Sequence, residues 1–172
     1  MTTPTTSTLT GERAELVQTL DSHRDFLRFT VRGLTDEQAT QRPTASELTL
    51  AGLIKHVAGT EAAWVRFIEG GPQAMSGDWS PEAWAREWRL EPGQTLASVL
   101  EDYAAVAAHT DDLVATLPDL DASHPLPAAP WFQPGARRSA RRVFLHIIAE
   151  TAQHAGHADI LRETIDGQKT MG

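Results

Sequence analysis

The chain has 172 residues, of which 41% are hydrophobic and 22% charged, and its formal net charge is −8. These values fit a single globular domain with a real core, and without a Lys/Arg block they argue against a nucleic-acid partner. The chain has no cysteine, which excludes disulfides, thiolate metal sites and a protein thiol nucleophile. Any metal must therefore be held by His and carboxylate, and any reacting thiol must be brought in by a substrate or cofactor.

The N-terminal residues differ in composition from the rest of the chain. Residues 1–9 are predicted to form a disordered tail in front of one domain over residues 10–172. The segment MTTPTTST lacks the basic and apolar regions of a signal peptide. No apolar run approaches the roughly 20 residues that span a bilayer. We therefore expect a cytoplasmic protein with no membrane partner.

Four segments have the three- and four-residue hydrophobic spacing of amphipathic helices. The first is expected to begin after an N-cap at Thr10, and the last to lie between an N-cap at Ser139 and a C-terminal Gly167. The four segments cover about residues 11–34, 49–69, 96–117 and 140–166.

The connections between these segments contain turn and loop signals. Thr35 and Gln38 form a capping-box pattern for a short helical turn, and residues 81–88 predict a second short helix. Residues 118–137 carry five prolines and are expected to form a long ordered loop. No strand-like alternation of useful length is present. The sequence therefore predicts an all-α fold, a single-domain four-helix bundle with long inter-helix connections.

The stretch HIIAETAQHAGHAD, residues 146–159, gathers three of the seven histidines around one glutamate. With about 100° of rotation per helical residue, His154 lies about 40° to one side of Glu150. By the same rotation His146 and His157 lie within about 40° on the other side. Leu161 continues this face, so we expect it to point into the bundle.

Inward ionisable groups are costly unless they are paired or bound to a metal. Glu150 and His154 are four residues apart, a usual spacing for two ligands on one helix. His146 and Glu150 have the same spacing, and the spacing alone does not choose between the two pairs. A third ligand must come from another helix, and His56 in LIKHVAG is the best candidate. Core packing of these histidines is the alternative to a metal site.

The segments GLTDEQATQRPTASELTLAGLIKHV at 33–57 and HIIAETAQHAGHADILRETIDG at 146–167 resemble the DinB-like superfamily of metal-binding four-helix bundles. The resemblance is strongest to its actinobacterial branch, which includes mycothiol-dependent enzymes. It implies that His56, Glu150 and His154 are the metal ligands, with Glu150 standing where many members have His. Mycothiol-dependent maleylpyruvate isomerase has similar ligands. Its additional domain has no counterpart in this sequence, so that reaction is not expected.

The resemblance also implies a function and a set of reactants. Two imidazoles and one carboxylate leave an open position on a Zn²⁺ ion, or on Ni, Fe or Mn. A thiol bound there would lose its proton. We therefore expect a mycothiol S-transferase of detoxification, acting on a small-molecule thiol and an electrophile. Apolar surfaces on the first and third helical segments also predict a homodimer. A metal-dependent hydrolase and a non-catalytic, dimeric metal-binding stress-response protein are the alternatives.

Further residues are assigned roles within this hypothesis. His157 or Asp159 would fix a ligand or move a proton. Aromatic and basic side chains near the metal would pack on the substrate or meet a carboxylate, and their alternative roles are core anchors and solvated arginines. The candidates are Trp64, Arg66, Trp131, Arg137 and Arg138.

Overall fold

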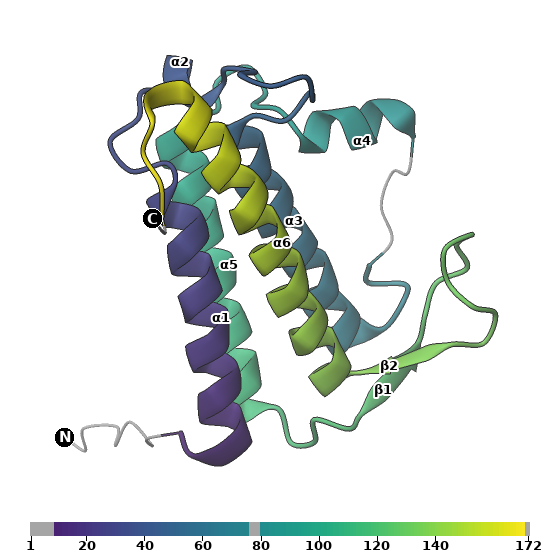
Figure 1. The fold of residues 1–172 in the computed structure, drawn as a ribbon. Coiled ribbons are helices and arrows are strands. Elements are labelled where there is room, and N and C mark those ends of the chain that lie inside the picture. Colours follow the sequence, from purple (N-terminus) through teal and green to yellow (C-terminus); the bar gives the residue numbers. More distant parts are fainter. Residues whose placement is uncertain (1–8, 76–79, 171–172) are drawn as a thin grey trace.

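Four long helices lie side by side in the computed structural model, which describes residues 9–75 and 80–170 (Figure 1). This arrangement confirms the predicted all-α fold, a four-helix bundle. Helix α1 packs mainly against α6, and α3 packs against both α5 and α6. The four helices are α1 (Gly11–Phe29), α3 (Leu50–Gly70), α5 (Leu96–Thr116) and α6 (Ala140–Asp166).

The ends of α6 and α3 follow from local chemistry. The side chain of Ser139 accepts a hydrogen bond from the Arg142 amide at 3.2 Å, and Gly167 ends α6 in the left-handed conformation with φ 80°. The Thr49 side chain accepts from the Gly52 amide at 3.0 Å at the start of α3. Capping oxygens satisfy amides that have no partner within a helix, so these ends were readable from the sequence.

The predicted end of the first helix is wrong. Helix α1 stops at Phe29, and the chain continues through turns in which Val31 and Leu34 donate to carbonyls three residues earlier. Val31 is buried and Leu34 packs against the core. The hydrophobic spacing therefore continued past the helix because these side chains still reach the core.

The connections contain shorter elements. Helix α2 (Asp36–Ala39) has the predicted capping box of Thr35 and Gln38, and α4 (Pro81–Glu87) confirms the second short helix. The prediction of a loop over residues 118–137 is only partly right, because β1 (Ser123–Pro125) pairs antiparallel with β2 (Arg137–Ser139). In this hairpin His124 lies opposite Arg138. Strands of three residues are too short to show a period of two in the sequence.

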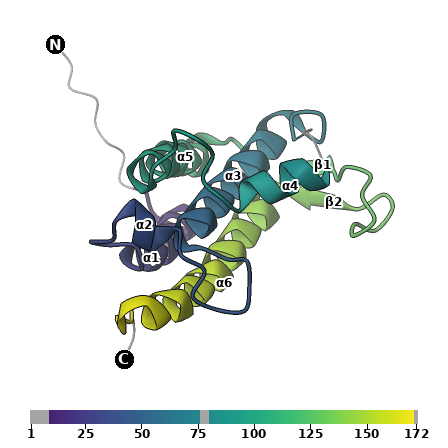
Figure 2. The ribbon, with the colours of Figure 1, turned by 90° about the horizontal axis from the view of Figure 1, so that it is seen from above.

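Helix α4 and the hairpin project from the bundle on the side where α3 and α6 pack, near opposite ends (Figure 1). Figure 2, which looks down on the bundle from above, shows both again on that side. They therefore flank one face of the α3–α6 pair. No helix in residues 9–75 and 80–170 has the length and hydropathy of a membrane span.

The core consists of two apolar clusters with polar residues between them. On α3, for example, one cluster ends at Ala58 and the other begins at Trp64. A buried polar side chain occupies the gap on every long helix, so the bundle has a polar layer about halfway along its length. This polar layer contains Arg24 of α1, Glu61 of α3, Thr110 of α5, and Thr151 and His154 of α6.

The carboxylate of Glu61 is neutralised inside this layer. Arg24 donates to both of its oxygens, and the side chain of Thr110 donates to Oε1 at 2.6 Å. The side chains of Arg24 and Glu61 are both completely buried. Arg24 also forms an ion pair with Asp111 at 2.8 Å. Because a buried charge without a partner is strongly destabilising, this pair fixes α1, α3 and α5 relative to one another.

We predict that Glu61→Ala lowers the free energy of unfolding by about 3 kcal/mol, because it leaves Arg24 buried with only part of its partners. Urea unfolding of the full chain measures this change. Glu69→Ala, which removes an exposed carboxylate 2.9 Å from His109, is the matched control and should cost less than about 1 kcal/mol. Equal and small effects of the two substitutions would contradict the role of the buried pair.

Candidate metal centre

The packing of α3 on α6 brings three ligand-type side chains together. His56 comes from α3, and Glu150 and His154 come from consecutive turns of α6. One ligand atom of each lies within 4.8 Å of the other two, and Nε2 of His154 is 3.6 Å from Oε2 of Glu150. These three residues, here called the His/Glu/His group, can hold one divalent ion after small side-chain movements.

His56 has the surroundings expected of a ligand. It is 7% exposed, and its Nδ1 is buried with no hydrogen-bond partner among the residues that the structure describes. Oε2 of Glu87 lies 3.7 Å from that nitrogen, beyond hydrogen-bond distance. A buried polar atom without a partner is rare and needs an explanation. Metal ligation explains this atom, because a ligand histidine binds the ion through one ring nitrogen and donates from the other to a nearby carboxylate, such as that of Glu87.

His154 is held in the form that binds metals. Burial, and then the neighbouring His56 and His157, lower the pKa of His154 to about 4. The imidazole is therefore neutral near pH 7, with a lone pair available. Its Nδ1 lies 3.3 Å from Nδ1 of His157. With Nε2 turned toward Glu150, the contact between the two Nδ1 atoms restrains the orientation of the His154 ring.

Two tryptophans from the α4 segment cover the group on one side. The ring of Trp88 stacks on His56 with centroids 3.7 Å apart and an interplanar angle of 17°, and Trp84 meets His56 edge-on at 6.1 Å. The approach depends on Gly52, because a Cβ at this position would lie 2.0 Å from the backbone oxygen of Trp88. No sequence pattern assigns Trp84, Trp88 or Gly52 to the site, and only tertiary packing shows their place.

His146 also lies beside Glu150. Its Nε2 is 3.8 Å from Oε1 of Glu150, and its ring packs edge-on against Trp64 at 4.9 Å. Burial, and then Arg138 and Arg142, lower the pKa of His146 to about 4. The ring is thus neutral and lies between the His/Glu/His group and Trp64. It is outside the set of three whose ligand atoms gather within 4.8 Å.

The other predicted site residues are spread over several environments. The Asp159 carboxylate accepts from the Thr170 amide at 2.7 Å, and Arg137 donates to the Ser123 carbonyl at 2.6 Å. Arg66 is exposed on α3, and Trp131 is 65% exposed beside Phe132. Trp64 contacts His146, which lies beside Glu150, and Arg138 contacts Trp64, so these two pocket candidates are linked to the His/Glu/His group.

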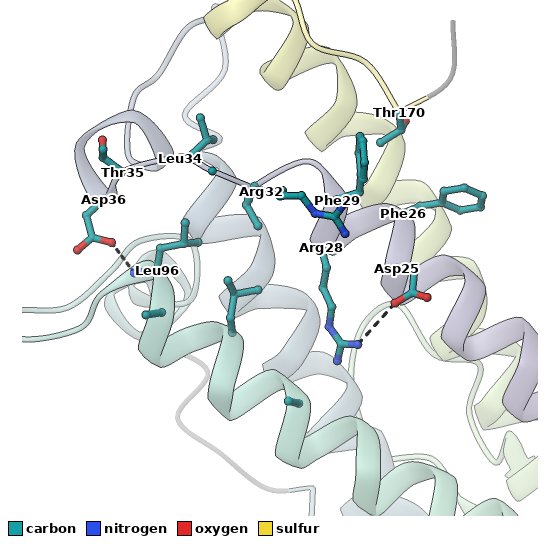
Figure 3. A pocket seen from close by; sticks show the side chains of 15 residues that line it. Asp25, Phe26, Arg28, Phe29, Arg32, Leu34, Thr35, Asp36, Leu96 and Thr170 are labelled. Atoms are coloured by element: carbon teal, nitrogen blue, oxygen red, sulfur yellow. Dashed lines mark hydrogen bonds and ion pairs between the residues drawn. The ribbon is translucent and has the colours of Figure 1, made fainter.

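A cavity of about 1070 Å³ lies elsewhere, along α1 and α5 (Figure 3). No residue of α3 or α6 lines it. Figure 3 shows Asp36 accepting from the Leu96 amide at 2.8 Å, and Arg28 paired with Asp25 at 3.9 Å. The chemistry of the ligand-type residues therefore does not lie in this cavity.

The fold and the His/Glu/His group together define a protein of the DinB-like superfamily. Within it, the model of the family described as Mycothiol-S-transferase matches residues 15–167, and the chain belongs to this family. Among solved structures, the fold is similar to the conserved protein of locus from Enterococcus faecalis, with a TM-score of 0.65 and 17% identity over 93% of this chain and all of that chain. No curated protein matches the chain.

We predict that the full chain binds one divalent ion, and that His56→Ala, Glu150→Ala and His154→Ala each lower its affinity by at least about 100-fold, because each removes one of three protein ligands. Equilibrium dialysis against zinc with elemental analysis measures this. His146→Ala is the matched control and should keep the stoichiometry. Undiminished zinc affinity in Glu150→Ala, together with loss of affinity in His146→Ala, would contradict Glu150 as a ligand and point to His146 instead.

We predict that His157→Ala weakens zinc binding by about tenfold without abolishing it, since second contacts to a ligand histidine typically contribute 10- to 100-fold. Competition with a chelating dye measures the affinity. His109→Ala, which changes an exposed histidine of α5, should leave it unchanged. Equal zinc affinities of His157→Ala and His109→Ala would contradict a role of His157 in the metal site.

Proposed function

We propose that this protein is a metal-dependent S-transferase that joins a low-molecular-weight thiol, mycothiol, to an electrophile in a detoxification reaction. The supporting observation is the convergence of His56, Glu150 and His154 in a chain of the mycothiol-S-transferase family. The absence of cysteine from the whole chain agrees with it, because the reacting sulfur must then come from a substrate.

The donor set suits catalysis better than a purely structural role. Closed structural zinc sites use four protein ligands, commonly with cysteine, whereas catalytic sites use three and keep one position open. Zinc, or nickel, iron or manganese in its place, would supply a Lewis acid that lowers the pKa of a bound thiol toward neutrality. The carboxylate of Glu150 and two neutral imidazoles would leave about one positive charge there.

The remaining residues hold and shield this centre. His157 keeps the His154 ring in place through the contact between their Nδ1 atoms. Trp84 and Trp88 cover His56 and exclude water from that side. His157 is half-buried next to a ligand, so it is also the candidate that accepts the thiol proton and passes it to solvent.

The proposed transfer is balanced without any further reagent. The thiol loses its proton, the sulfur forms a bond to the electrophilic carbon, and a leaving group departs with the bonding electron pair. In an addition to an activated double bond, the product carbanion instead takes up one proton. His157 could return that proton, because it is a neighbour of the ligand group rather than a member of it.

We predict that the zinc-loaded chain accelerates conjugation of mycothiol to monochlorobimane, and that Glu150→Ala lowers kcat/KM by at least about 100-fold, as expected for loss of charge stabilisation at a reacting group. Fluorescence of the conjugate gives the rate. Glu163→Ala, on an exposed turn of the same helix, should keep the full rate.

The alternatives make different predictions for the same protein. Rapid ester hydrolysis without thiol consumption would favour the metal-dependent hydrolase. A protein that binds zinc, forms a dimer and accelerates neither reaction would be the non-catalytic metal-binding protein, and would contradict our proposal.

A further inference from the structure

Arg138 reaches toward the His/Glu/His group from the hairpin. Its guanidinium carbon lies 4.6 Å from the centroid of Trp64 and 5.5 Å from that of Phe132. The Trp64 ring contacts His146, and His146 lies 3.8 Å from Glu150. A continuous series of contacts, through two rings, therefore joins this arginine to the ligand group.

The guanidinium of Arg138, which is partly buried, lacks the partners that the two buried arginines have. Its Nη1 is buried and donates to no partner among the residues that the structure describes, and no carboxylate oxygen of these residues is paired with it within 4.0 Å. Arg24 is paired with Glu61, and Arg162 donates to Asp166 at 2.9 Å. An unmade hydrogen bond of a buried charged donor is costly, so Arg138 is a donor without its acceptor.

The local charge calls for an anion. Burial, and then Arg142, lower the pKa of Arg138, while the more distant Glu150 partly offsets them. An arginine keeps its charge under such conditions, so the guanidinium stays positively charged and favours an anion beside it. His146, the nearest ionisable group on the path to Glu150, contributes no negative charge.

The aromatic contacts fix this charge in place. Stacking on Trp64 and Phe132 restrains the guanidinium plane and reduces the entropy that an arginine loses on binding. A planar fork of N–H donors fits a carboxylate through two parallel hydrogen bonds. Trp64 itself is buried, and the partly exposed Phe132 ring offers an apolar surface beside the charge.

We propose that Arg138 binds the carboxylate of the electrophilic substrate, which is an organic acid with an apolar or aromatic body. The body packs against Phe132, and the reacting carbon points toward the His/Glu/His group. This assignment of the substrate class rests on the proposed S-transfer. It separates Arg138 from Arg137, whose guanidinium is bonded to Ser123 in the hairpin.

Calorimetric titration of the zinc-loaded full chain with benzoate and with benzamide tests the assignment. The two probes have the same ring, and only benzoate carries a carboxylate. Wild type should prefer benzoate, and Arg138→Met should weaken benzoate binding by about tenfold or more while leaving benzamide binding unchanged. Arg137→Met is the matched control on the same strand and should bind benzoate as the wild type does.

A second arm follows the reaction. With 4-(chloromethyl)benzoate as electrophile, Arg138→Met should raise KM, and with 4-(chloromethyl)benzamide it should have no effect. Arg138→Lys keeps the charge and loses the fork, so it should lie between wild type and Arg138→Met. If circular dichroism shows that Arg138→Met does not fold, Arg138→Lys replaces it as the test variant.

The outcomes separate the two proposals. Equal benzoate affinity in wild type and Arg138→Met, or no preference for benzoate over benzamide, would overturn the anion site and leave zinc binding and S-transfer untouched. Loss of benzoate binding in Arg138→Met, in a protein that conjugates no thiol, would support the anion site and overturn the S-transferase.

Discussion

A carboxylate that is completely buried between packed helices must be neutralised, and Glu61 meets this constraint near the middle of the bundle, while Glu150 on α6 remains 30% exposed. Glu61 has Arg24, and the pair is completely buried. Glu150 faces His154 at 3.6 Å and lies in one group with His56. The low pKa of His154 leaves that imidazole uncharged at neutral pH, so it cannot balance the carboxylate. A divalent cation would supply the missing charge and use the imidazole lone pairs.

Helix α3 supports both arrangements and so determines the geometry of the site. Glu61 ties this helix to α1 and α5 through Arg24 and Thr110. One and a half turns earlier, His56 faces α6 and the tryptophans of the α4 segment. Gly52 lets the Trp88 backbone approach the same helix closely enough for its ring to stack on His56. The buried ion pair thus holds the helix that presents one ligand to the other two.

Much of this site could be predicted from the sequence, because α6 begins and ends at local caps and its rotation places Glu150 and His154 on one face. Helical spacing alone could not choose between His146 and His154, since both lie within 3.8 Å of Glu150. The family resemblance favoured His154, and in the structure His154 is the one that gathers with His56. The place of Trp88 depends on packing between distant segments. Arg137 and Arg138 were indistinguishable while the hairpin was expected to be a loop. On a strand, alternate side chains face opposite sides, and Arg138 is the one that turns inward.

X-ray absorption of the zinc-loaded protein, recorded before and after addition of mycothiol, tests the central claim most directly. The chain has no cysteine, so a zinc–sulfur contact at about 2.3 Å can come only from the added thiol. Our account predicts nitrogen and oxygen neighbours alone in the first spectrum and one added sulfur neighbour in the second. An unchanged spectrum at saturating mycothiol, with zinc still bound, would contradict it.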